Sequence, residues 1–111
     1  MDVRTFQRAN AARAAEWHKG GDEWTLADWA VAMAGEAGEA CNIVKKLRRF
    51  QTGIRGNAEH ASDLRAALAE ELADTVTYAA LLAEAIGCDL EAELVRKFNA
   101  VSDKHGFEFK L

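Results

Sequence analysis

Apolar residues recur every three or four positions along most of the chain, which is the period of an amphipathic helix. Glycines and short polar stretches divide this pattern into four segments. We therefore predict four helices, at residues 3–17, 25–50, 62–87 and 89–106. The stretch 51–61 is polar, contains two glycines and has no sustained period, so we expect an exposed loop there.

Residue types that are typical of helix ends support these limits. Thr25, followed by Asp28 three residues later, resembles a capping box, and Ser62 and Asp89 are the expected N-caps of the third and fourth helices.

The third helix is apolar around much of its circumference, and a domain this small has little room to bury it alone. We therefore expect a homodimer or a homotetramer. In the fourth helix the residues expected to face inward are Leu90, Leu94, Phe98 and Val101.

Composition strengthens the helical prediction. Proline is absent and alanine is the commonest residue, so nothing in the chain interrupts a helix. The β-branched and aromatic residues do not form the alternating runs that a strand requires. With 111 residues, 50% of them hydrophobic and 29% charged, the chain has the length and the apolar content of one folded domain. We predict a single all-α domain over residues 1–111, a bundle of four main helices.

Charge and cysteine content narrow the range of partners. The formal net charge of −4 opposes binding to duplex nucleic acid, which requires a positive face. No stretch reaches the length of a membrane span, and the N-terminus lacks the apolar segment of a signal peptide. Cys41 and Cys88 have no metal-binding spacing and are expected to be core residues with reduced thiols. We therefore expect a cytoplasmic protein, or one of the host cytoplasm if a phage encodes it.

Carboxylates occupy positions where the helical pattern predicts apolar residues. Glu36 falls within the apolar stripe of the second helix, with Glu39 at its edge. Glu71 falls within an apolar arc of the third helix, with Asp74 at its flank. The residues that share these two arcs are Trp29, Met33, Ala40, Ile43, Leu47 and Phe50 in one helix, and Leu64, Leu68, Thr75, Tyr78 and Leu82 in the other. Each helix therefore presents two acids, three residues apart, from an apolar face.

Four carboxylates that point into one interior would repel one another, and an isolated buried anion would take up a proton. A bound cation removes this conflict, and a set of oxygen ligands favours a hard ion such as Mg²⁺. Mg²⁺ commonly binds through a few carboxylates and the phosphates of a substrate. The pattern therefore indicates a magnesium site for a phosphorylated substrate.

The acids have two other possible interpretations, solvated surface residues and ligands of a di-iron site. A single glutamate on a helix is more often solvated or paired with a basic residue, but two matched pairs within two apolar stripes disfavour chance. A di-iron bundle would need Glu-x-x-His motifs, and no glutamate here is followed by histidine at that spacing. His18, His60 and His105 lie near helix ends or in the loop. Iron chemistry is therefore disfavoured.

The two acid motifs resemble the signature of a known family. The segments Gly35-Glu36-Ala37-Gly38-Glu39 and Glu70-Glu71-Leu72-Ala73-Asp74, with the ending Lys97 to Phe107, resemble the all-α nucleoside triphosphate pyrophosphohydrolases, the MazG-like and dCTP pyrophosphatase group. The resemblance implies that Glu36, Glu39, Glu71 and Asp74 hold Mg²⁺, for which Mn²⁺ can substitute. It also implies that water attacks the α-phosphorus of a nucleoside triphosphate and releases a monophosphate and pyrophosphate. Glu39 is our candidate for the base that accepts the proton of this water.

The remaining candidate residues concern the substrate. Lys45, Lys97 and Lys104 are candidates for binding phosphate, and Asn99 lies in the family-like Lys-Phe-Asn segment. Trp29 and Tyr78 are candidates for contacting the base. The chain has Gly35-Glu36 where MazG proteins have a double glutamate, so it resembles the dCTP pyrophosphatase-like and small phage-type members more closely. This resemblance implies deoxynucleotides, with dGTP or dATP ahead of dCTP.

Two alternative functions remain open. One is a related phosphohydrolase of the same fold that acts on dCTP, on a dUTP-like substrate or on phosphoribosyl-ATP. The other is a non-enzymatic helical module that oligomerises through the same apolar faces. The second alternative would tolerate glutamine at all four acid positions and would not respond to Mg²⁺.

Overall fold

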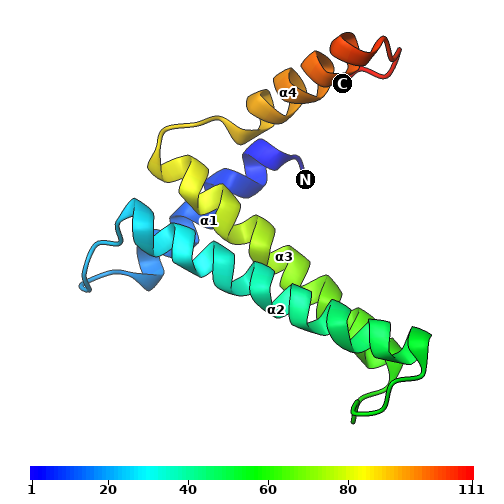
Figure 1. The fold of residues 1–111 in the computed structure, drawn as a ribbon. Helices are drawn as coiled ribbons and strands as arrows, with labels where there is room; N and C mark the ends of the chain where they lie inside the picture. The colour runs from blue at the N-terminus through cyan, green and yellow to red at the C-terminus, as the bar shows by residue number, and fades with distance from the viewer. The chain divides into compact units, whose positions relative to one another are not determined.

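The computed structural model describes all of residues 1–111 and contains four α-helices and no strand (Figure 1). The helices are α1 (Val3–Trp17), α2 (Leu26–Thr52), α3 (Ala61–Ala85) and α4 (Leu90–His105). The all-α prediction is confirmed, and the limits of all four helices agree with the sequence pattern to within a few residues. No helix combines the length and the apolarity needed to cross a membrane.

Two of the three predicted N-caps are confirmed. Thr25 Oγ1 accepts a hydrogen bond from the Asp28 amide at 3.2 Å, and Asp28 Oδ2 accepts one from the Thr25 amide at 2.8 Å, which completes the capping box of α2. At α4, Asp89 Oδ1 accepts from the Ala92 amide at 3.1 Å. The prediction for Ser62 is wrong. The chain is already helical at Ala61, so Ser62 lies inside the first turn of α3.

Glycine ends two of the helices in the left-handed conformation. Gly53, with φ of 71°, follows α2 and donates its amide to the Arg49 carbonyl. Gly106, with φ of 70°, follows α4, and the next amide, that of Phe107, donates to the Ser102 carbonyl at 2.8 Å. Residues with a Cβ rarely adopt this conformation, so glycine sets both ends.

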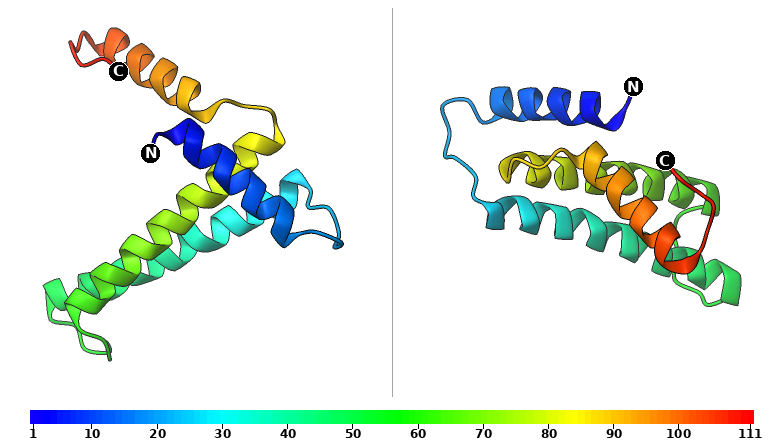
Figure 2. Two further views of the ribbon diagram at one scale, coloured as in Figure 1. Left: turned by 180° about the vertical axis from the view of Figure 1, so that it is seen from behind. Right: turned by 90° about the horizontal axis from the view of Figure 1, so that it is seen from above.

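The chain divides into two compact units. Residues Trp24–Ala79 form the helical hairpin, in which α2 and most of α3 run antiparallel beside each other (Figure 2). The loop that joins them folds against α2, because Asn57 Nδ2 donates to the Lys46 carbonyl at 2.6 Å and Lys46 Nζ pairs with Glu59 at 2.9 Å. The second unit, the terminal unit, comprises Met1–Glu23 and Ala80–Leu111 and contains α1, the end of α3 and α4.

A buried glutamine organises the terminal unit. The Gln7 side chain of α1 is only 6% exposed and bonds three groups around the turn between α3 and α4. Its Nε2 donates to Glu84 Oε2 at 2.9 Å and to the Cys88 carbonyl at 2.7 Å, and its Oε1 accepts from the Leu90 amide at 3.0 Å. α1 is thereby fixed to this turn by hydrogen bonds rather than by its thin apolar stripe.

Several predicted core positions are exposed. Leu94, Phe98 and Val101 of α4 are 49%, 43% and 44% exposed, and only Leu90 of the predicted stripe is half-buried. In this unit α4 contacts α1, and a single neighbouring helix covers one flank of a helix rather than a whole apolar stripe. Phe50 and Cys41 of α2 are also exposed, so both expectations of burial are wrong.

Candidate metal centre

The half-buried residues of α2 follow the predicted register. They include Trp29, Met33, Glu36, Ile43 and Leu47, with the buried Ala40 among them, at alternating spacings of four and three. This stripe faces α3, because the Trp29 and Tyr78 rings meet across the hairpin with centroids 6.3 Å apart. Glu36 therefore lies on the face that α2 turns toward α3, as the periodicity predicts.

α3 repeats this arrangement around Glu71. Its hairpin face carries the buried Leu64 and the half-buried Leu68, Thr75 and Tyr78, and Glu71 is half-buried among them. Asp74 is exposed at the flank of this stripe, as Glu39 is in α2. The predicted acid register is thus reproduced in both helices.

The hairpin brings three of the four acids together. One carboxylate oxygen from each of Glu36, Glu71 and Asp74 lies within 4.8 Å of the other two. Glu39 lies close enough to Glu71 to influence its ionisation, although it is not one of these three. Two acids from each of two antiparallel helices therefore gather around the Glu71 carboxyl.

This crowding changes the ionisation of Glu71. Its pKa is raised from the ordinary value of 4.5 to about 7. The largest cause is hydrogen bonding between the carboxyl groups of Glu71 and Glu36, which requires one of the two to hold a proton. Burial and the neighbouring carboxylate of Glu39 raise the pKa further. At neutral pH Glu71 is therefore poised between its protonated and its charged form.

One atom of the cluster has no partner. Glu71 Oε2 is buried from solvent and accepts no hydrogen bond. A buried carboxylate oxygen without a partner is costly, so a cation or a proton is expected beside it. Acidic groups often gather on exposed surfaces without a metal; the buried and unsatisfied Glu71 Oε2 distinguishes this cluster. The donor set, three to four carboxylates and no nitrogen or sulfur, fits Mg²⁺ or Mn²⁺.

Aromatic rings adjoin the acids at one end. Trp29 precedes Glu36 by seven residues and Tyr78 follows Glu71 by seven, so antiparallel pairing places both rings about 10 Å from the carboxylates along the hairpin. Trp24 packs on Trp29 with ring centroids 4.6 Å apart. The sequence does not predict Trp24 as a site residue, because it lies before the N-cap of α2, where helical periodicity gives no facing direction.

None of the candidate phosphate-binding residues belongs to the cluster of Glu36, Glu71 and Asp74. Lys45 is exposed on α2, on the side of the helix away from the stripe that carries Glu36. Lys97 and Lys104 are exposed on α4 and belong to the terminal unit. Asn99 of the same helix is engaged by the tail: its Nδ2 donates to the Leu111 carbonyl at 3.2 Å, and its Oδ1 accepts from the Leu111 amide at 2.9 Å. In this structure the Asn99 amide holds the C-terminal tail.

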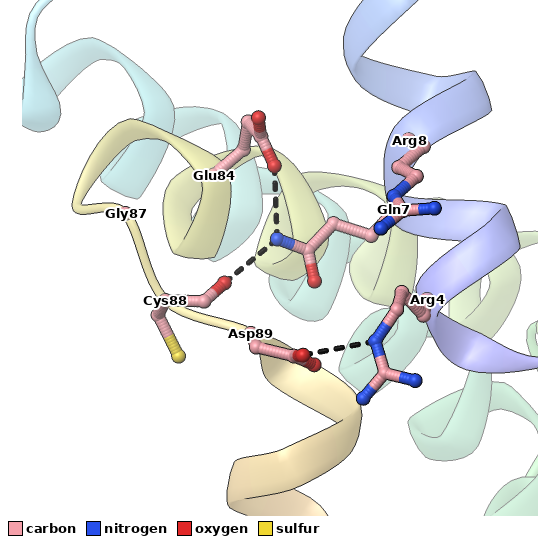
Figure 3. Close-up of a pocket in the computed structure, with 7 residues that line it drawn as sticks. All are labelled: Arg4, Gln7, Arg8, Glu84, Gly87, Cys88 and Asp89. Carbon is pink, nitrogen blue, oxygen red and sulfur yellow. Dashed lines mark hydrogen bonds and ion pairs between the residues drawn. The ribbon is translucent and has the colours of Figure 1, made fainter.

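The terminal unit contains a separate cavity of about 250 Å³, whose lining side chains serve the fold (Figure 3). Its charged and polar side chains bond one another: Gln7 bonds Glu84, and Arg4 pairs with Asp89 at 2.9 Å. The Arg4 guanidinium also pairs with Glu91 at 2.9 Å and holds the pKa of Asp89 below its usual range. Because these side chains bond one another, the cavity has few polar groups available to bind a ligand.

No family model, curated protein or solved structure matches the chain. The acids, their register and the hairpin geometry are therefore the observations on which a function is inferred.

Proposed function

We propose that the protein is a Mg²⁺-dependent nucleoside triphosphate pyrophosphohydrolase, similar to the MazG-like and dCTP pyrophosphatase group. The observation that carries the proposal is the buried, unpartnered Oε2 of Glu71 within the cluster of Glu36, Glu71 and Asp74. A carboxyl group in this setting needs a positive partner, and acids of this type are ligands for hard divalent cations. Glu39 completes the proposed ligand set from the edge of the cluster.

The carboxylates have a defined task in this reaction. Glu36, Glu71 and Asp74 would hold Mg²⁺, which when bound neutralises the charge that develops on a triphosphate. Glu71 must lose its proton when the cation binds, and its raised pKa makes this loss occur near neutral pH. By holding the cation, the acids would help to fix the triphosphate in position, which is the main requirement of phosphoryl transfer.

The reaction consumes one water. The water oxygen forms a bond to the α-phosphorus, the bond between this phosphorus and the α,β-bridging oxygen breaks, and pyrophosphate leaves. Glu39 would take the proton of the water, because its side chain is exposed at the edge of the cluster and is not one of the three acids whose oxygens lie together. The products are a nucleoside monophosphate and pyrophosphate.

The rest of the substrate would lie toward the aromatic rings. Trp29 and Tyr78, both in the helical hairpin, would contact the base. We propose deoxynucleotides as substrates, with dGTP or dATP preferred, because an apolar wall at Trp29 and Met33 offers no partner for a 2′-hydroxyl. An unpartnered hydroxyl of this kind costs on the order of 1 to 3 kcal/mol, or roughly tenfold to a hundredfold in kcat/KM.

We also propose that the active form is a homodimer or a homotetramer. Large apolar side chains are about half exposed on the hairpin and on α4, namely Val44, Leu72, Val76, Leu94, Phe98 and Val101. Their number on a chain of this size exceeds the scattered exposure that a monomer usually shows. Light scattering at micromolar concentration should give at least twice the monomer mass, and a monomer would contradict this proposal.

The proposed activity is tested with a panel of deoxynucleoside and nucleoside triphosphates in the presence of Mg²⁺. The products are resolved so that monophosphate with pyrophosphate is distinguished from diphosphate with phosphate. We expect the first pair of products and a higher kcat/KM for dGTP than for GTP. If no triphosphate is hydrolysed and Mg²⁺ has no effect on the protein, the non-enzymatic helical module becomes the better account.

A further inference from the structure

The helical hairpin has an acid side. At about 100° per residue, Glu39 is turned about 60° from Glu36 around α2, and Asp74 is turned by the same angle in the same sense from Glu71 around α3. In two antiparallel helices, equal turns away from the line of contact lead to the same side of the pair. Both residues indeed lie close to Glu71, so they mark one shared side of the hairpin.

The opposite side of the hairpin is apolar. Ala37 on α2 and Leu72 on α3 are each turned about 100° the other way, away from the acids. Between positions 30 and 44 of α2, and between 69 and 76 of α3, this side carries no charged residue. We call it the apolar face. Its large side chains, Val44, Leu72 and Val76, are 50%, 53% and 54% exposed.

The chain exposes more surface than compact units of its size. Its accessible surface is 8140 Å², whereas a compact monomer of 12.1 kDa exposes about 6,000 Å². Two entirely separate compact units, each of about half this mass, would together expose about 7,300 Å². The remaining surface of about 900 Å² is close to the roughly 800 Å² that each partner buries in a stable dimer.

The apolar face is complementary to a second copy of itself in side-chain size. On α2 it carries a column of small residues at spacings of four, three and four, namely Ala30, Ala34, Ala37 and Cys41. Trp29 meets Tyr78 across the hairpin, so Leu72 and Val76 of α3 lie level with this column. A two-fold axis parallel to the helices places α3 of one copy over α2 of the other at the same height. The large side chains then enter the space above the small ones.

Charge also favours a second copy on this face. The chain has a net charge of −4, and its hairpin acids lie on the other side. Two copies that met through their acid sides would bring these carboxylates together in the low dielectric of an interface. A different partner with a charged surface would find no opposite charge on the apolar face and would bury its own charges unpaired. Contact between two apolar faces avoids both costs.

We propose that the apolar face of the hairpin is the interface with a second copy of the chain, in which Leu72 and Val76 of each copy pack over the small-residue column of the other. The inference assigns a face to the homo-oligomer suggested above and does not depend on the hydrolytic reaction. Each acid cluster is then assembled within one chain, and the two clusters face solvent on opposite sides of the dimer, where metal and substrate reach both.

The test compares two matched variants of the full chain, Val76→Glu and Val31→Glu. Val31 is 72% exposed on the same hairpin but is turned about 140° from Glu36 toward the acid side, so it lies off the apolar face. Glutamate forms helices at least as well as valine, so both variants should keep the helical circular dichroism spectrum. Sedimentation velocity at micromolar concentration should give a dimer for the wild type and for Val31→Glu. Val76→Glu should raise the dimer Kd at least about a hundredfold, because it buries an unpaired charge.

A second measurement uses the wild-type chain and its two thiols. Cys41 belongs to the small-residue column and is exposed in the single chain, whereas Cys88 lies in the terminal unit. Alkylation of Cys41 should be at least about tenfold slower at concentrations above the dimer Kd than below it, because only the dimer covers this thiol. Cys88 is the internal control and should react at one rate throughout. This result decides the question even if Val76→Glu does not fold.

The outcomes separate this inference from the proposals before it. A dimeric wild type, a monomeric Val76→Glu and protection of Cys41 would support the apolar face. If Val76→Glu stays dimeric, or Cys41 reacts equally fast at all concentrations, the interface lies elsewhere and the inference is wrong, although the homo-oligomer stands. A monomeric wild type would overturn both. None of these results bears on whether a triphosphate is hydrolysed, which the substrate panel decides.

Discussion

Glu36 and Glu71 face each other across the helical hairpin with a carboxylate oxygen of each within 4.8 Å of the other, and the Glu36 carboxyl is the largest cause of the raised pKa of Glu71. The two residues are 35 positions apart in sequence, and each is the acid of its helix that lies on the hairpin face. A pair of this kind is stable only when it holds a proton or a cation.

The first prediction concerns pH in the absence of metal. The pKa of Glu71 is raised from 4.5 to about 7 in the folded state, so folding favours the protonated form. Its contribution to the free energy of unfolding is therefore greatest below pH 4.5, declines as pH rises toward 7 and is constant above that. Thermal melts in EDTA should show Tm falling between pH 5 and 7. Glu71→Gln should flatten this slope, and an unchanged slope would contradict the assignment.

The second prediction concerns metal. Mg²⁺ or Mn²⁺ should raise Tm without nucleotide, since a ligand that binds only the folded state stabilises it by about 2.7 kcal/mol at a hundredfold excess over Kd. Below pH 7 the proton on Glu71 competes with the cation, so affinity should fall by about tenfold per pH unit. Isothermal titration across this pH range measures the effect. A metal affinity that does not depend on pH would show that Glu71 is not a ligand.

The third prediction separates a true helix cap from a residue that only resembles one. Thr25→Ala should lower the free energy of unfolding by about 1 kcal/mol, because it removes the hydroxyl that accepts from the Asp28 amide. Ser62→Ala is the control and should be close to neutral or slightly stabilising, since Ser62 lies inside α3. Urea denaturation measures both, and equal losses would restore Ser62 as a cap.

The fourth prediction concerns Gln7. Gln7→Ala leaves the Leu90 amide and the Cys88 carbonyl without their partner, which should cost about 2 kcal/mol. Gln51→Ala is the matched control, because Gln51 is exposed and accepts one hydrogen bond from Arg48. It should change stability by less than about 0.5 kcal/mol. Similar effects of the two variants would show that the Gln7 contacts do not organise the turn.

The sequence predicts the helices and the register of the acids because both depend on local information. A helix of fixed period determines which residues share a face, and Glu36 and Glu71 each have apolar neighbours at three and four residues that mark that face. Antiparallel pairing of α2 and α3 then brings the two faces together. The acid cluster and its unsatisfied Glu71 oxygen arise only where the two helices pair, so the pattern of either helix alone does not predict them.

Other features escaped prediction because they depend on contacts distant in sequence. Gln7 bonds residues 77 to 83 positions away, and nothing in its own helix marks it as buried. The stripe of Leu94, Phe98 and Val101 has helical period, but period alone does not show whether a neighbour covers it. Asn99 resembles a binding residue in its motif and is engaged by the backbone of Leu111 twelve residues later.

The most direct test of the central claim is the rate of pyrophosphate release from dGTP with Mg²⁺ in Glu71→Gln and Glu70→Gln. The two glutamates are neighbours, but Glu71 lies in the cluster while Glu70 is exposed on another side of α3. We expect Glu71→Gln to lower kcat by at least about a thousandfold with an unchanged helical circular dichroism spectrum, and Glu70→Gln to stay within about twofold of wild type. Pyrophosphate release at the wild-type rate in Glu71→Gln would contradict the assignment.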